Sequence, residues 1–202
     1  GDAFAVGLAC GGRIEILLEP VGPAPGLPVA VLRTLVEARA ARRAMVMRFD
    51  LATGARSLVP HDGIAMSGRE GEVVVTAHLP LRRLFVVGAT HLAQVLAPMA
   101  RLAEFDVTVI DPRPAFATAA RFPNTILVDD WPDRALARLI PDAFTALAIL
   151  SHDAKIDDPA VVAALASPAF YIGALGSGKT HAARLDRLRL TSAEAARLHA
   201  PI

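Results

Sequence analysis

The sequence predicts an α/β fold, with a C-terminal parallel sheet that carries helices on both faces and a smaller N-terminal α/β domain. Two observations predict it. After about residue 80, fully apolar runs alternate with helical segments, and a glycine-containing loop follows the first apolar run. Strands that are apolar on both faces are typical of a buried parallel sheet with right-handed crossovers. We therefore expect a Rossmann-type domain at residues 81–202 and a separate domain at residues 1–80.

The C-terminal elements follow from this alternation. Strands are expected at residues 84–87, 107–110, 126–128, 146–150 and 170–172, and helices at residues 91–104, 115–121, 133–139 and 158–166. Asp158-Pro159 indicates a helix start, because a capping Asp precedes Pro at the first helical position. Thr191 to Glu194 has the pattern of a capping box that opens a last short helix.

The N-terminal part mixes short strands with one helix. Strands are expected at residues 4–8, 13–19, 44–49, 56–59 and 72–77, with a Pro/Gly loop at residues 20–28 and a helix at residues 27–42. These elements predict a small α/β domain, and the simplest interpretation is a lid or packing domain without chemistry of its own.

Composition excludes several classes of protein. The chain has 202 residues, is 53% hydrophobic and 20% charged, and carries a formal net charge of +1, which argues against a nucleic-acid-binding surface. No apolar run reaches the roughly 20 residues that span a membrane. The single cysteine, Cys10, excludes an internal disulfide, and no His or Cys spacing indicates zinc. We expect a cytoplasmic protein that lacks some residues at both ends.

The loop after the first C-terminal strand resembles a dinucleotide-binding fingerprint. Gly88, Thr90 and Ala93 occupy the three glycine positions of G-x-G-x-x-G, and His91 opens the helix. Asp111 ends the next strand, at about the 20-residue distance of an acid that binds a ribose hydroxyl. Thr90 adds a Cβ where a pyrophosphate approaches the backbone. NAD(P) or FAD binding is therefore open but disfavoured.

Two further loops carry polar residues. Ser151, His152 and Asp153 follow the fourth strand, at the edge where open α/β sheets bind ligands. Adjacent residues cannot readily form a catalytic triad.

The second loop, Gly173 to Thr180, satisfies the P-loop pattern G-x-x-x-x-G-K-[ST]. The short stretch after it has the pattern of a helix, however, and supplies no strand for a magnesium-binding Asp. A glycine-rich helix start with Lys179 still favours a phosphate-bearing ligand.

Cys10 is followed by two glycines, which favour an accessible thiol. A buried, inert cysteine is the common alternative. If the thiol is exposed, Cys10 is a candidate sulfur carrier or ligand of a soft metal such as molybdenum.

Several motifs together resemble one family, the XdhC/CoxI-type accessory proteins of xanthine dehydrogenase and carbon monoxide dehydrogenase. They are Gly7 to Pro20 around Cys10, Gly88-Ala-Thr-His91, Asp111-Pro-Arg113, Arg121-Phe-Pro123, Ser151-His-Asp153, Ala169 to Ser177 with Lys179-Thr-His181, and His199-Ala-Pro-Ile202. Two departures stand out: Thr90 replaces a usual glycine, and Gly178-Lys179 replaces two basic or bulky residues. The second departure alone creates the P-loop match.

The resemblance implies a maturation factor. It would bind molybdenum cofactor (molybdopterin, in its mononucleotide or dinucleotide form), protect it during sulfuration by a cysteine desulfurase, and deliver it to a xanthine dehydrogenase-type apoenzyme. We expect a homodimer. The expected cofactor-binding residues are Cys10, Gly88, Thr90, His91, Asp111, Arg113, Ser151, His152, Asp153, Gly173, Gly176, Ser177, Lys179, Thr180 and His181.

Three alternatives stay open beside this hypothesis. The first is an NAD(P)-dependent oxidoreductase, which the fold and Asp111 favour and Thr90 disfavours. The second is a P-loop nucleoside triphosphatase, and the third is a scaffold without a cofactor that holds a dehydrogenase partner.

Overall fold

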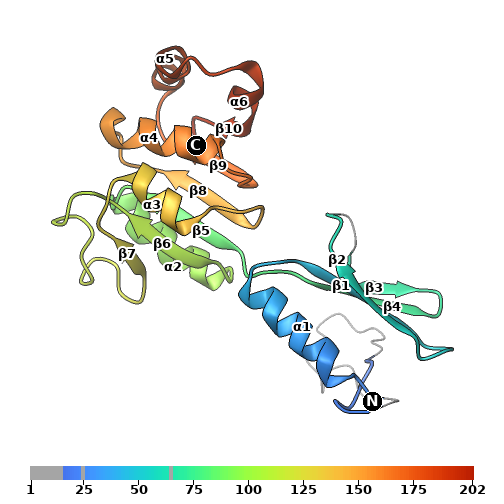
Figure 1. Cartoon of the computed structure of the whole chain (residues 1–202). Helices are drawn as coiled ribbons and strands as arrows, with labels where there is room; N and C mark the ends of the chain where they lie inside the picture. The colour runs from blue at the N-terminus through green and yellow to red at the C-terminus, as the bar shows by residue number, and fades with distance from the viewer. Residues whose placement is uncertain (1–15, 24–25, 64–65) are drawn as a thin grey trace, which may run out of the picture. The chain divides into compact units, whose positions relative to one another are not determined.

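The computed structural model describes residues 16–23, 26–63 and 66–202 (Figure 1). The chain divides into two compact units, Gly1–Pro80 and Leu81–Ile202. Cys10, the strand expected at residues 4–8 and the first three residues of the strand expected at residues 13–19 lie outside the described residues. No helix of the described part is both long enough and apolar enough to span a bilayer.

The first unit holds one helix and a four-stranded antiparallel sheet of order β2-β1-β4-β3. The elements are α1 (Val29–Ala40), β1 (Met45–Asp50), β2 (Arg56–Pro60), β3 (Gly68–Glu70) and β4 (Val73–His78). The predicted helix and the last three predicted strands are confirmed to within two residues. The short strand β3 was not predicted, and residues 16–19 form no strand.

The second unit is a six-stranded parallel sheet of order β10-β9-β8-β5-β6-β7, with helices on both faces (Figure 1). Its strands are β5 (Arg83–Val87), β6 (Asp106–Ile110), β7 (Ile126–Val128), β8 (Thr145–Ile149), β9 (Tyr171–Ala174) and β10 (Leu198–His199). Its helices are α2 (His91–Leu102), α3 (Pro132–Leu139), α4 (Ala154–Leu165), α5 (Gly178–Leu188) and α6 (Ser192–Arg197).

Both faces of this sheet are buried, as the apolar strands predict. Val86 and Val87 are neighbours in β5 with no exposed surface, yet they belong to different core clusters, because successive side chains of a strand point to opposite faces. One cluster includes residues of α3 and α4. The other includes three alanines of α2, Ala93, Ala97 and Ala100, whose small side chains permit close packing on the strands.

The strand order creates a switch point between β5 and β8. From β5 the chain proceeds outward through β6 to β7, and then returns to β8 on the other side of β5. The loops after β5 and β8 therefore diverge to opposite sides, and open α/β sheets bind ligands in the crevice this creates outside the carboxyl ends of the strands.

Two helix predictions are wrong. Residues 115–121 form turns rather than a helix. Prolines flank this segment, and Arg121 bonds to the Phe116 carbonyl and to the Gln94 side chain, so its polar groups are satisfied by tertiary partners. The helix expected to start at Asp158 starts at Ala154 instead, with Asp153 as its cap and Pro159 inside it.

The position of Pro159 has a physical reason. A proline inside a helix removes one backbone hydrogen bond. The face of α4 that includes Ile156, Ala160, Val161 and Ala164 is buried against the sheet, and this burial outweighs the lost bond. Tertiary packing thus overrides the local start signal.

The capping box is confirmed at the start of α6, where Thr191 and Glu194 satisfy each other's backbone N–H groups. Strand β10 was not predicted, since its two residues carry no periodic signal. It pairs in parallel with β9, where Leu198 lies opposite Ile172.

Gly88 provides a test of the switch point. Its φ is +98°, and a Cβ there would lie 2.7 Å from the backbone N and Cα of Ser151. We expect Gly88→Ala to lower the free energy of unfolding by at least about 2 kcal/mol, measured by urea denaturation, because both backbone strain and overpacking oppose it.

The matched control is Gly178→Ala. A Cβ at Gly178 meets nothing within 4 Å, and its φ is not in the left-handed region. We expect a change within about 0.5 kcal/mol. Equal effects of the two variants would contradict the close approach of Gly88 to Ser151.

Candidate functional site

Three loops leave the carboxyl edge of the sheet side by side. They follow β5, β8 and β9, and backbone hydrogen bonds hold them at one level. Gly88 N donates to the Ile110 carbonyl (2.8 Å), Leu150 N to the Val87 carbonyl (2.7 Å), and Leu175 N to the Ile149 carbonyl (2.9 Å). These bonds continue the sheet ladder beyond the strands, so the residues that follow are rigidly placed around the switch point.

The loop after β5 is built as a short fingerprint loop. Thr90 is the N-cap of α2, and its hydroxyl accepts a hydrogen bond from Ala93 N at 3.4 Å. Ala93 has no exposed surface, as the third small residue of the fingerprint requires for helix–sheet packing. His91 is exposed at the first position of α2. Thr90 thus has a structural role at the position where a dinucleotide fold has glycine.

Asp111 is fully buried, and its carboxylate is saturated. Oδ1 accepts from Arg113 N (2.9 Å) and Arg113 Nε (2.8 Å), while Oδ2 accepts from Ala89 N (2.7 Å) and Arg113 Nη2 (2.7 Å). Burial opposes ionisation, but the hydrogen bonds from Arg113 and Ala89 outweigh it and lower the pKa of Asp111. The Arg113 guanidinium also stacks over the Phe116 ring, 4.3 Å from its centroid.

These four donors change the interpretation of Asp111. A carboxylate offers about four lone pairs, and all four have partners within the chain. A ribose hydroxyl would have to displace one of them. Asp111 therefore has no free acceptor for the ribose that the sequence predicts it to bind. Its hydrogen bonds instead connect the loop after β5 to the loop after β6.

The loop after β8 is polar but is not a triad. Ser151 Oγ donates to Asp157 Oδ1 at 2.6 Å and accepts from Asp153 N at 3.1 Å. Asp153 caps α4 by accepting from Lys155 N at 2.9 Å. His152 is exposed with a φ of +63°, an unusual backbone conformation for a residue other than glycine. Ser151 and Asp153 thus order the loop and the start of α4.

Asp157 and Arg184 belong to the site but were missed by sequence reasoning. Both are 2% exposed, and Arg184 Nη2 lies 3.5 Å from Asp157 Oδ2. Burial raises the pKa of Asp157, against the opposing effects of the Ser151 hydrogen bond and the Arg184 charge. The available signal was an ionisable residue on the apolar face of a helix, which placing the helix start at Asp158 concealed.

The glycine-rich loop after β9 starts α5. Ser177 is the N-cap, and its Oγ accepts from Thr180 N (3.1 Å) and bonds to Thr180 Oγ1 (2.9 Å). Lys179 is exposed beside them. His181 Nδ1 is buried and has no partner among the described residues. This arrangement leaves the first turn of α5 open to an anionic ligand.

Glycine is required at two positions of this loop for different physical reasons. Gly173 lies within β9, where a Cβ would come within 2.8 Å of the Tyr171 ring. Gly176 has a φ of +151°. The loop also follows the fifth strand of a Rossmann-ordered sheet rather than the first strand of its fold. Its resemblance to a P-loop therefore extends to the sequence pattern and not to the strand arrangement.

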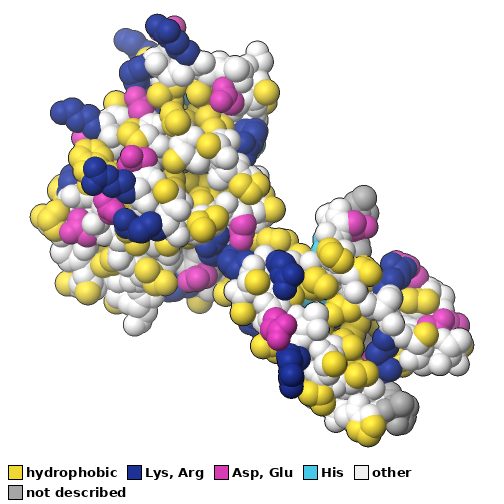
Figure 2. Space-filling view, viewed as in Figure 1, with side chains coloured by type: hydrophobic (Ala, Val, Ile, Leu, Met, Phe, Trp, Pro, Cys, Tyr) yellow, Lys and Arg dark blue, Asp and Glu magenta, His cyan; other side chains and the backbone are white. Residues whose placement is uncertain are grey.

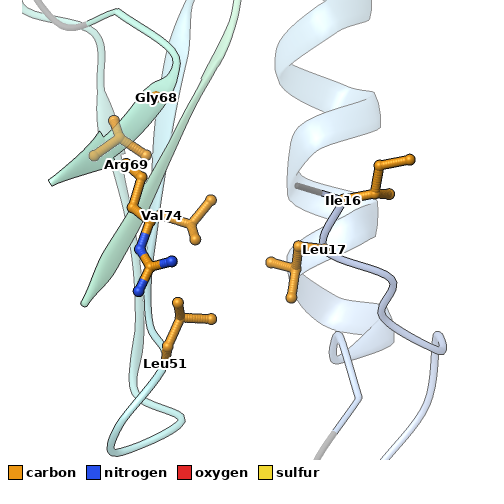
Figure 3. Close-up of a pocket in the computed structure, with 7 residues that line it drawn as sticks. Ile16, Leu17, Leu51, Gly68, Arg69 and Val74 are labelled. Carbon is orange, nitrogen blue, oxygen red and sulfur yellow. The ribbon is translucent and has the colours of Figure 1, made fainter. Parts of the chain in front are cut away.

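Two cavities bear on the location of a site. One, in the first unit, has a volume of about 420 Å³ and is lined mainly by apolar residues. Figure 3 shows Ile16 and Leu17 beside α1 and, across from them, Leu51, Gly68, Arg69 and Val74. The other, of about 200 Å³, lies between α4 and α5 and is lined by His152, Ala154, Asp157, Leu175, Thr180, Arg184 and Arg187. The smaller cavity has the buried ionisable groups, and so we regard it as the stronger candidate.

Thus the structure brings Gly88, Ser151 and the residues around Asp157 together at the switch point, with Gly176 to His181 beside them. Asp111 and Arg113 lie on the loop after β6. Cys10 lies outside the described residues, and among those described no three His, Cys, Asp or Glu side chains are grouped to hold a metal ion. Lys and Arg are interspersed with Asp and Glu on the face that Figure 2 shows, rather than gathered into one basic surface.

Comparison with known proteins agrees with this geometry. Residues 84–202 match the XdhC Rossmann domain family. A curated protein of Escherichia coli K12, the molybdenum cofactor insertion chaperone PaoD, is 30% identical over 185 residues, which cover 92% of this chain and 50% of PaoD. The chain therefore spans about half the length of this relative.

A solved structure has the same fold. It is a Bacillus halodurans protein described as a xanthine dehydrogenase, which matches with a TM-score of 0.70 and 19% sequence identity over 86% of this chain and 59% of its own. At that identity the match shows the fold alone.

The saturated Asp111 carboxylate gives a test. We expect Asp111→Asn to lower the free energy of unfolding by about 3 kcal/mol at neutral pH, because an amide cannot accept all four hydrogen bonds and leaves Arg113 uncompensated. Since the pKa of Asp111 is lowered in the folded state, its contribution is present above about pH 3.9 and is lost as the pH falls through the folded-state value.

Urea unfolding of both proteins between neutral pH and pH 3 measures this difference. The exposed Asp106, at the start of the strand that leads to Asp111, supplies the control Asp106→Asn, for which we expect a change within about 0.5 kcal/mol. A difference between wild type and Asp111→Asn that does not shrink in acid would show that the charge of Asp111 is not its source.

Proposed function

Because the chain belongs to the family of XdhC Rossmann-domain proteins, we propose that it is a maturation factor that binds molybdenum cofactor and passes it to a molybdoenzyme. One observation carries the proposal: the 30% identity to a molybdenum cofactor insertion chaperone, over 92% of this chain. The finer parts of the proposal are a xanthine dehydrogenase-type apoenzyme as the recipient and assistance in sulfuration of the metal by a cysteine desulfurase.

The carboxyl edge of the sheet fits such a ligand. Molybdopterin carries a phosphate, or a pyrophosphate in its dinucleotide form, and two helices, α2 and α5, present their N-termini at this edge. Backbone N–H groups and the positive end of the helix dipole favour a phosphate there. The exposed Ser177, Lys179 and Thr180 at the start of α5 supply further donors. We propose that these groups hold the phosphate end of the cofactor.

Cys10 is the candidate contact to the metal of the cofactor. The cofactor, when bound, supplies a soft metal and sulfur-rich centre, for which a thiolate is a suitable ligand. The two glycines after Cys10 favour access to its thiol. We therefore propose that Cys10 contacts the molybdenum or its sulfur.

Coexpression with the molybdopterin biosynthetic enzymes tests the function. We expect the purified wild-type protein to release a pterin on denaturation, identified by mass and by fluorescence after oxidation. Cys10→Ala should retain at least tenfold less, because it lacks the soft ligand, and Cys10→Ser, which keeps the side-chain size, should resemble Cys10→Ala. A wild-type protein without pterin would refute the proposal.

An NAD(P)-dependent oxidoreductase is the second candidate, and the strand order is the observation that favours it. Thr90 and the saturated Asp111 weigh against it. We expect isothermal titration with NADH and NADPH to give no saturable binding, because the ribose hydroxyls would lack an acceptor. Micromolar affinity for either one would instead favour the oxidoreductase.

A further inference from the structure

Arg184 is a buried arginine with most of its donors unused. Nη2 donates to the Leu175 carbonyl at 3.2 Å and lies 3.5 Å from Asp157 Oδ2. Nε and Nη1 are buried and have no hydrogen-bond partner among the described residues. These two atoms carry three of the five N–H groups of a guanidinium. Because buried donors are almost always paired, the arginine calls for a partner that the chain itself does not supply.

The cavity of about 200 Å³ beside Arg184 limits the size of that partner. Pockets for drug-sized ligands have volumes of about 300 to 1,000 Å³. The cavity is therefore smaller than a pocket for the whole cofactor, whereas one small ionic group with a few water molecules fits.

The charges around the cavity favour an anion. The guanidinium of Arg187, on the cavity rim, is held by both oxygens of Asp158, at 2.5 and 2.7 Å. Among the described residues Arg184 pairs with Asp157, at a distance of 3.5 Å that is longer than the roughly 2.7 to 2.9 Å of a strong charged hydrogen bond. Burial also raises the pKa of Asp157, which weakens its ability to neutralise Arg184. The positive charge of Arg184 is thus poorly compensated.

The helix α5 adds to this preference. Thr180 lines the cavity from the first turn of α5, an 11-residue helix whose N-terminus favours negative charge. Its hydroxyl shares a hydrogen bond with Ser177 Oγ, in which either oxygen can be the donor. A guanidinium, a hydroxyl and a helix N-terminus together form the usual surroundings of a bound phosphate.

We propose that the cavity between α4 and α5 binds one tetrahedral oxyanion of the phosphate type, with Arg184 as its main donor. Asp157 is the positioning residue, since it fixes Arg184 from one side while Ser151 fixes Asp157. The source of the oxyanion is a phosphate group of the cofactor, which rests on the proposed function, or free phosphate, which does not.

Titration with inorganic phosphate tests the site. We expect Arg184→Gln to weaken phosphate binding at least tenfold, because glutamine still bonds to a carbonyl but carries no charge. The matched control, Arg189→Gln, removes the same charge from an exposed position just after α5, and we expect less than a threefold effect. Unchanged phosphate affinity in folded Arg184→Gln would overturn the proposal, as would a wild-type protein that binds no phosphate.

A second variant covers the case in which Arg184→Gln does not fold. The double variant Arg184→Met with Asp157→Leu removes both buried charges together, which proteins commonly tolerate. Circular dichroism and thermal unfolding verify its fold. We expect it to lose phosphate binding at least tenfold, and retention of wild-type affinity in this variant would also overturn the site.

The source of the oxyanion is distinguished by comparing cofactor-loaded protein with protein from which the cofactor has been released. If the cofactor phosphate fills the cavity, the loaded protein will not bind inorganic phosphate and the released protein will. Equal binding by both would overturn the assignment to the cofactor while leaving its maturation role standing. Arg184-dependent phosphate binding in a protein that never retains pterin would refute that role and leave the oxyanion site.

Discussion

The approach of two loops at the switch point is the constraint on which the rest of the second unit depends. Gly88 lies against the backbone of Ser151, so close that no side chain fits between them. This contact fixes the spacing of the loops that lead to α2 and α4, which are capped by Thr90 and Asp153, and Ser151 in turn bonds to Asp157. The geometry of the polar network around Arg184 therefore depends on the backbone contact between Gly88 and Ser151, and not only on the side chains that form the network.

Two buried carboxylates near this contact show how partners decide the state of an acid. Asp111 and Asp157 are almost equally inaccessible, at 0% and 2% exposed. Asp111 accepts four strong hydrogen bonds and is held ionised, whereas Asp157 is bonded by Ser151 and lies near one distant guanidinium, and burial raises its pKa. Asp111 stabilises the fold, and Asp157 leaves the positive charge of Arg184 only partly compensated.

Much of the fold was predictable, because apolar periodicity reports burial directly. Five of the six strands of the second unit were predicted on that basis, and the capping box of α6 was predicted from the local pattern of Thr191 and Glu194. The start of α4 was not, because Asp158-Pro159 is a strong local signal that the burial of Ile156 and Val161 overrides. The site was predictable in its loops, at Gly88, Ser151 and Gly176. Asp157 and Arg184 were not, because their pairing depends on how α4 and α5 pack, which no spacing in the sequence encodes.

The occupied carboxylate of Asp111 also has a consequence for selectivity. If the chain carries molybdenum cofactor as proposed, its site must not fill with the common dinucleotides that bind to the same fold. With its sugar-reading acid committed to Arg113 and Ala89, this cleft would leave two ribose hydroxyls without partners, a penalty of about 1 to 3 kcal/mol for each that is buried. A ligand without a ribose at that position would escape this penalty, and we therefore expect the hydrogen bonds of Asp111 to disfavour dinucleotides.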